Sequence, residues 1–87
     1  MSEYKDYFTT YNISLSAVLV AFDFKLEKIE KGMGSKSLFY FLNSTNLQDC
    51  NQEYWRKELT IEPQLLFDSL KFLKNRLYNS FENGNDL

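Results

Sequence analysis

The amino-acid sequence predicts a small two-layer α+β domain, in which a mainly antiparallel three-stranded sheet is packed by a long C-terminal helix. Residues 63–81 place leucines at steps of four, three and four, which is the spacing of one helix face. Residues 37–42 read Ser-Leu-Phe-Tyr-Phe-Leu, a run of strand-forming residues. Gly32 and Gly34 stand just before that run, as in a hairpin loop. The predicted order is strand, helix, strand, strand, helix, helix.

The N-terminal part supplies the first strand and the first helix. Residues 1–5 are polar, and we expect them to be frayed. Residues 7–11 are dense in strand-forming side chains. Residues 13–22 are too apolar for a surface element, and their alanines and polar start favour a buried helix, although Val18 and Val20 suit a strand as well. The helix could be capped by Asn12, Ser14 or Ser16.

The hairpin is predicted from residues 24–31 and 37–42. Phe24 and Leu26 alternate with charged residues, but Ile29 falls out of phase, so either a β-bulge re-aims it or a helix continues through Phe22, Leu26, Ile29 and Met33. The glycines that follow favour the hairpin. Alternating charges over residues 23–31 indicate an edge strand blunted by charge. Residues 37–42 are apolar on both faces, which indicates a central or doubly covered strand.

Two helices complete the chain. Thr45 followed by Gln48 resembles a capping box, and a second helix is predicted over residues 47–57. The third starts at Pro63 with Glu62 at its positive end, and Gly84 can end it before a polar tail, residues 82–87. Its apolar stripe contains Leu66, Leu70, Leu73, Leu77 and Phe81, widened on one side by Phe67 and Tyr78.

Length and composition bound the class of protein. The 87 residues form a single domain, 1–87, with an ordered core at about 6–81. Aromatic residues make up 17% of the chain, and we expect them to fill a core that is small for its surface. Cys50 is the only cysteine, so no intramolecular disulfide can form, which fits a reducing compartment. No signal peptide or membrane span is visible, so a soluble cytoplasmic protein is expected. The net charge of −2 argues against a broad duplex-binding face.

The residues also resemble a known kind of family. Phe8-Thr9-Thr10 leads into the apolar helix, the segments 24–29 and 38–41 form the hairpin, and Ile61-Glu62-Pro63 opens the last helix. Residues 7–79 in this order look like a family of very small, uncharacterised domains found in bacteria, archaea and their phages or mobile elements. The resemblance implies a fold and no activity. Members often have Asp where Thr10 or Tyr11 stands, so the idea of a chemically active acid there is weakened.

The chemistry that the sequence offers is sparse. Histidine is absent, which removes the commonest general base and metal ligand. Cys50 lies on an apolar helix stripe and is expected to be a structural thiol. Residues 32–37 faintly match a phosphate loop, but a strand follows where a helix is required. Asp49 and Glu53 stand one turn apart without a third ligand at a matching spacing. We therefore expect no enzyme, no metal site and no cofactor.

Two functional hypotheses follow. The first is a non-enzymatic protein–protein interaction module of phage or mobile-element origin, an inhibitor or an accessory subunit, that docks a partner or a second copy. Its contact would be made by Tyr54, Trp55, Arg56 and Lys57, because tyrosine, tryptophan and arginine are enriched at binding hot spots. The alternative is a nucleic-acid-binding accessory protein that stacks bases on residues 39–41. Its basic residues would be Lys25, Lys28, Lys71, Lys74 and Arg76. No membrane partner or small-molecule substrate is expected.

Overall fold

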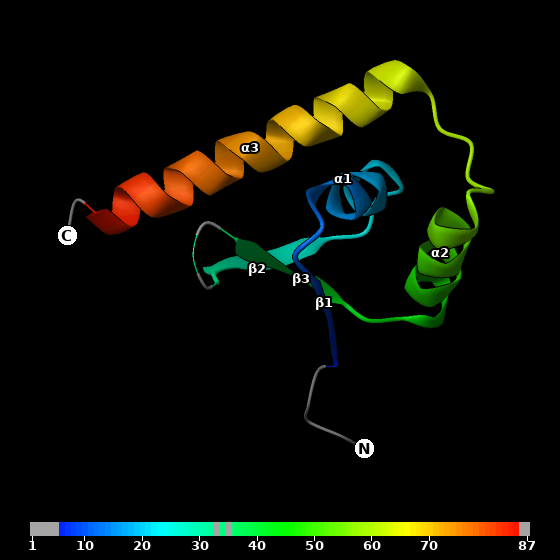
Figure 1. Ribbon diagram of the computed structural model, residues 1–87, viewed down its shortest axis with the longest axis horizontal. Helices are drawn as coiled ribbons and strands as arrows, with labels where there is room; N and C mark the ends of the chain where they lie inside the picture. Colours follow the sequence, from blue (N-terminus) through cyan, green and yellow to red (C-terminus); the bar gives the residue numbers. More distant parts are fainter. Residues whose placement is uncertain (1–5, 33, 35, 86–87) are drawn as a thin grey trace.

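The computed structural model describes residues 6–32, 34 and 36–85, with side chains described up to residue 79. The elements are β1 (Tyr7–Thr10), α1 (Ile13–Ala21), β2 (Leu26–Lys31), β3 (Ser37–Leu42), α2 (Thr45–Arg56) and α3 (Pro63–Asn85) (Figure 1). This order confirms the predicted strand–helix–strand–strand–helix–helix arrangement and the helical reading of residues 13–22. The segment 1–5, which we expect to be frayed, lies outside the described residues.

The sheet has the strand order β1-β3-β2, and β3 is antiparallel to both neighbours. Phe41 lies opposite Phe8 on β1 and Leu26 on β2, and Phe39 lies opposite Ile29 on β2. Residues that face one another across an antiparallel pair project to the same side, so these rings and aliphatic chains line one face of the sheet. The central position predicted for residues 37–42 is confirmed, and the charged β2 is an edge strand.

A β-bulge in β2 explains why Ile29 falls out of phase. Leu26 pairs with Phe41 and Lys28 pairs with Tyr40, so the register shifts between them and Glu27 is the extra residue. The bulge returns Ile29 to the same face as Leu26, where it packs on the core. The alternative of a helix continuing through this segment is wrong.

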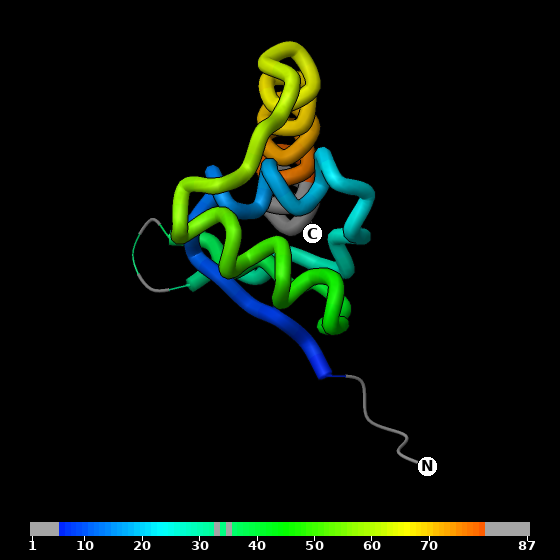
Figure 2. The backbone as a smooth tube through the Cα atoms, turned by 90° about the vertical axis from the view of Figure 1, so that its right-hand side faces the viewer, coloured from blue at the N-terminus to red at the C-terminus, as the bar shows by residue number. Residues whose placement is uncertain are grey.

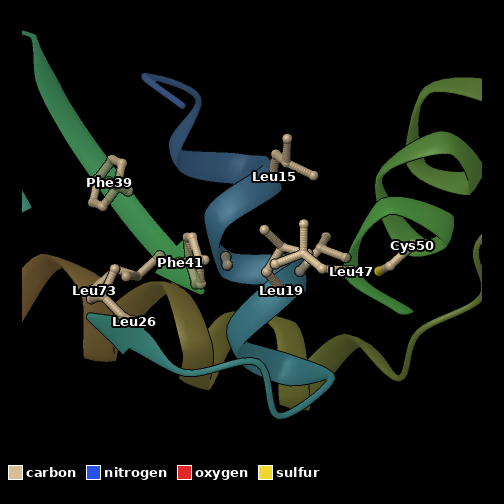
Figure 3. Close-up of a cluster of buried hydrophobic side chains, with 10 residues drawn as sticks. Leu15, Leu19, Leu26, Phe39, Phe41, Leu47, Cys50 and Leu73 are labelled. Atoms are coloured by element: carbon tan, nitrogen blue, oxygen red, sulfur yellow. The ribbon is translucent and has the colours of Figure 1, made fainter. Parts of the chain in front are cut away.

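The core forms where α1 and α2 meet the inner face of the sheet. Phe39 and Phe41 of β3 are buried, as are Leu15 and Leu19 of α1. From α2, Leu47 and Cys50 join the same cluster, and Figure 3 shows them reaching toward α1. The apolar surface that these side chains remove from water is the main source of stability for a domain of this size.

α3 closes the domain on the other side of α1. It lies against α1, which therefore stands between α3 and α2 (Figure 2). Its Leu73 is fully buried and points toward Phe41 and Leu26, so the C-terminal helix packs against the sheet as predicted (Figure 3). The helix continues to Asn85 and does not end at Gly84. A helical glycine costs about 1 kcal/mol relative to alanine but does not bar the helical backbone. The predicted placement of the Phe81 side chain lies outside the described side chains.

The helix N-termini are capped by neighbouring polar side chains. Asn12 caps α1, since its Oδ1 accepts from the Leu15 amide at 3.1 Å. The cap of α2 is Ser44 and not Thr45, because the Ser44 hydroxyl accepts from the Leu47 amide at 3.1 Å. The predicted capping box is also wrong: Gln48 donates its side-chain amide to Asn43. At α3, both Glu62 carboxylate oxygens accept amides, those of Gln64 and Leu65. This confirms Glu62 at the positive end of the helix.

The aromatic side chains do not all fill the core. Phe39 and Phe41 do, but a larger group is exposed, which corrects the expectation from composition. The exposed rings are Tyr7, Tyr11, Phe22, Trp55, Phe67, Phe72 and Tyr78. The helices of this protein cover only one face of its three-stranded sheet, and each helix also has a face that points to solvent. The interior is therefore too small to bury every ring. The exposed rings are therefore candidates for contacts with other molecules.

Candidate functional site

Trp55 stands out among the exposed rings because its orientation is held by the protein. Its side chain is 60% exposed near the C-terminal end of α2. The indole Nε1 donates to Asn51 Oδ1 at 2.9 Å, one turn back along the helix. The ring also meets Tyr54 edge to face, with centroids 5.0 Å apart. Tyr54 itself packs against the core. An exposed indole is thus presented in one orientation, which lowers the entropy that binding would cost.

Two cations follow Trp55 at the end of α2. Arg56 ends the helix and Lys57 caps it, and both are exposed. Lys57 adopts the left-handed conformation, with φ 63° and ψ 37°. This conformation costs a non-glycine residue roughly 1–2 kcal/mol. The predicted group Tyr54, Trp55, Arg56 and Lys57, here called the Trp55 surface, stands at the C-terminal end of α2, where Tyr54 is half-buried and the other three side chains are exposed.

The basic residues of the nucleic-acid hypothesis do not form one patch. Lys71 and Lys74 lie on one flank of α3. Arg76 lies on the opposite flank, where its guanidinium carbon is 5.7 Å from the Phe72 ring centroid. Lys25 precedes β2, and Lys28 is on β2 itself. The structure thus separates the five residues into three places. Asp68, three residues before Lys71, accepts a hydrogen bond from Gln64, and no ion pair joins Asp68 to Lys71 among the side chains that the structure describes.

Lys28 belongs to a cluster on the outer face of the sheet. Its Nζ lies 3.1 Å from Glu30 Oε2 and 4.6 Å from the Tyr40 ring centroid. The Tyr40 hydroxyl donates to Glu30 Oε1 at 2.7 Å, and Tyr7 meets the Tyr40 ring edge to face at 5.7 Å. The hydrogen bond from Tyr40, followed by the contact with Lys28, lowers the pKa of Glu30. The bond to Glu30 raises the pKa of Tyr40, and the contact with Glu30 raises that of Lys28. Lys28 is already paired within the protein.

The aromatic run on β3 does not form a platform of three rings. Phe39 and Phe41 point into the core, and Tyr40 between them points outward. The core reading of the two phenylalanines is confirmed. Of these three rings only Tyr40 faces outward, and its hydroxyl and ring are engaged with Glu30 and Lys28.

Cys50 lies at the base of a shallow groove between the end of α1 and α2. The groove has a volume of about 250 Å³, and Asp49 and Glu53 stand at its edge. Burial, followed by the nearby Glu53 charge, raises the pKa of the Cys50 thiol, which favours the unreactive protonated form. Within the described part of the chain, no three histidine, cysteine or acidic side chains are grouped so that they could hold a metal ion. The groove offers an apolar hollow with two acids at its rim.

The described part of the glycine-containing loop belongs to the β2–β3 hairpin. The Gly32 amide donates to the Lys36 carbonyl at 2.9 Å, so it is used within the hairpin. A Cβ added at Gly32 would stand 2.8 Å from the Tyr11 ring, which explains why glycine suits this position. Gly34 has φ 65°, the left-handed conformation in which glycine is least strained. The other loop positions, 33 and 35, lie outside the described residues.

Phe67 and Tyr78 are the residues that sequence reasoning placed wrongly. They are 57% and 66% exposed, so they do not widen the buried stripe of α3. On a helix of 3.6 residues per turn, both lie about 100° to 120° from the direction of Leu66. The sequence could have predicted this exposure from the angular offset, because the leucines that α3 turns toward the core lie within a narrower sector of the helix.

Comparisons with known proteins give a family and no activity. Among the residues that the structure describes, none of the helices combines the length and the apolar composition of a transmembrane segment. Neither the comparison with curated proteins nor that with solved structures produced a match. The model of one family, described as a domain of unknown function (DUF5659), matches residues 5–79, which include all the strands, α1, α2 and most of α3. The chain therefore belongs to this family of domains of unknown function.

Proposed function

We propose that the protein is a small non-enzymatic interaction module that docks a protein partner through the Trp55 surface. The observation that carries the proposal is the exposed indole held by Asn51 and Tyr54. A large ring that is fixed in place and bordered by cations is typical of a binding hot spot. The ring would bury its faces in a pocket of the partner, while Arg56 and Lys57 would meet acidic groups at the rim.

Strain at Lys57 supports the same surface. A glycine would adopt φ 63° at little cost, yet lysine occupies the cap. Backbone strain in a non-glycine residue is common at binding sites, where a side chain is kept for its contacts. In this proposal the Lys57 ammonium adds a second positive charge near Trp55 for acidic groups of the partner. Action as an inhibitor or accessory subunit, a cytoplasmic location and an origin in phages or mobile elements stay predictions from the sequence.

The test compares Trp55→Ala with Phe72→Ala, a matched control that removes an exposed ring from α3. Cross-linking and affinity capture from the native host identify the partner, and the purified pair is then measured by isothermal titration calorimetry. Sedimentation equilibrium measures self-association. We expect Trp55→Ala to weaken association by at least about 2 kcal/mol, the threshold of a hot spot, and Phe72→Ala to leave it unchanged.

Circular dichroism separates docking from folding. Trp55→Ala should keep the native spectrum and a near-native melting temperature, because most of the indole is already in water. If the variant unfolds, Trp55 belongs to the core and the proposal is wrong. If Trp55→Ala and Phe72→Ala associate with the partner equally strongly, Trp55 does not contribute to the interface.

A further inference from the structure

The exposed flank of α3 carries a regular pattern of rings and cations. Phe67, Lys71, Lys74 and Tyr78 follow one another at steps of four, three and four, so they form one stripe along the helix, here called the α3 stripe. All four side chains are exposed. The helix buries a different side, where Leu73 reaches the core and Leu70 and Leu77 are partly buried. The α3 stripe is therefore not used in holding the domain together.

Neither lysine of the stripe has a counter-charge within ion-pair distance among the described side chains. The ion pair found among the described side chains joins Lys28 to Glu30 on the sheet. It includes neither Lys71 nor Lys74. Asp68, the nearest acid along α3, accepts a hydrogen bond from Gln64 at 3.0 Å. On the opposite flank, by contrast, the Arg76 cation lies against the Phe72 ring. The α3 stripe thus presents a local positive charge on a chain whose net charge is −2.

The geometry of the stripe selects the chemistry of a ligand. Phe67 and Tyr78 are eleven residues apart, which is roughly 16 Å along an α-helix, and the two ammonium groups lie between them. A ligand that satisfies all four groups needs adjacent negative charges and flat apolar faces on either side. Single-stranded nucleic acid has both, since its phosphates are spaced along the backbone and its bases are free to stack. An acidic peptide has the charges without the flat faces, and a duplex keeps its base faces hidden.

We propose that the α3 stripe binds a short segment of single-stranded nucleic acid, with Lys71 and Lys74 on phosphates and Phe67 and Tyr78 stacked on bases. The site lies on a different helix from the Trp55 surface and uses none of its residues, so either proposal can fail without the other. It also narrows the basic set that the sequence suggested. Lys71 and Lys74 are kept, Phe67 and Tyr78 are added, and Lys25, Lys28 and Arg76 are left out.

The experiment measures binding of a fluorescein-labelled oligothymidylate of about ten nucleotides, within the usual size of single-strand sites, by fluorescence anisotropy over a series of salt concentrations. Two phosphate contacts give an expected slope of log K against log salt of about −1.4, at about −0.7 for each contact on a single strand. Lys71→Gln and Lys74→Gln should each reduce the slope to about −0.7. Phe67→Ala and Tyr78→Ala should weaken binding by roughly 5- to 150-fold, the effect of one lost stack, while the slope stays the same.

Arg76→Gln and Phe72→Ala are the matched controls, because they remove one cation and one exposed ring from the other flank of the same helix. Both should bind as the wild type does. No binding at low salt would overturn the proposal. So would control variants that lose as much affinity as the stripe variants. If a polyglutamate peptide or duplex DNA competes as strongly as the unlabelled single strand does, the site recognises negative charge alone. That result would also overturn the proposal.

Discussion

The Tyr40 hydroxyl donates a hydrogen bond of 2.7 Å to Glu30 Oε1, joining the central strand to its edge neighbour on the uncovered face of the sheet. The same carboxylate meets Lys28 through its other oxygen. Three side chains that could have bound another molecule are thus bound to one another. This pairing is the reason that Lys28 does not enter either proposed binding surface.

The Tyr40–Glu30 bond predicts an individual tyrosine titration. The bond raises the pKa of Tyr40, so its stabilising contribution is present below the unfolded pKa and is lost as the pH rises through the folded pKa. NMR of the Tyr40 ring carbons should show this upward shift. Glu30→Gln should move the pKa of Tyr40 back down, whereas the control Glu27→Gln on the same strand should not. Equal effects of the two variants would contradict the hydrogen bond as the cause.

Glu30 should titrate in the opposite sense at low pH. Its pKa is lowered by the bond from Tyr40 and the contact with Lys28. Its contribution to stability is therefore present above the unfolded pKa and is lost as the pH falls through the folded pKa. Two-dimensional NMR of the carboxyl carbon measures the shift directly. In Tyr40→Phe the pKa of Glu30 should rise, and an unchanged value would contradict this account.

Leu73→Ala should destabilise the domain by about 2–5 kcal/mol, because it removes a fully buried side chain that joins α3 to the sheet. Urea unfolding monitored by circular dichroism measures the change. The control is Leu65→Ala on the same helix, whose side chain is exposed and whose loss should cost much less. A loss as small as that of the control would mean that α3 does not hold the core together.

Lys57→Gly should stabilise the fold by roughly 0.5–1 kcal/mol, since relief of the left-handed strain exceeds the added entropy of the unfolded chain. The control Arg56→Gly, at the last helical residue, should instead destabilise it. Thermal unfolding compares the two. If the Trp55 surface is the docking site, the more stable Lys57→Gly variant should also bind its partner more weakly. Lower stability of Lys57→Gly would rule out strain at this cap.

Cys50 should react with a thiol reagent at least about tenfold more slowly in the native protein than in urea, because only its rare thiolate reacts and its sulfur is buried. The matched control carries Cys50→Ala and Gln52→Cys, which moves the thiol to an exposed position on the same helix. This variant should react at the same rate in both conditions. If Cys50 reacts as fast in the native protein as in urea, its thiol is accessible and reactive, and the structural role assigned to it is wrong.

Local sequence signals predicted the elements well and their ends less well. The element order, the central position of β3 and the two alternatives for Ile29 could be derived from side-chain periodicity, since strands and helices repeat with different periods. The cap of α2 was displaced by one residue, because Ser44 and Thr45 are chemically equivalent as caps and only the chain path selects Ser44. The helical backbone of residues 82–85 was missed for a similar reason: glycine disfavours a helix without excluding it.

The sequence predicted the exposure of the aromatic rings only in part. Composition favours burial for every ring, yet burial depends on which faces find a covering layer, and that is a property of the assembled fold. The sequence by itself determined the class of the domain, the strand that lies at its centre and the absence of histidine chemistry. Only the tertiary structure decided that Tyr7, Tyr11 and Phe22 face solvent and that Tyr40 on β3 donates a hydrogen bond to Glu30 on β2. The physical reason is that periodicity is encoded locally, whereas burial and hydrogen bonds between strands depend on residues brought together from distant parts of the chain.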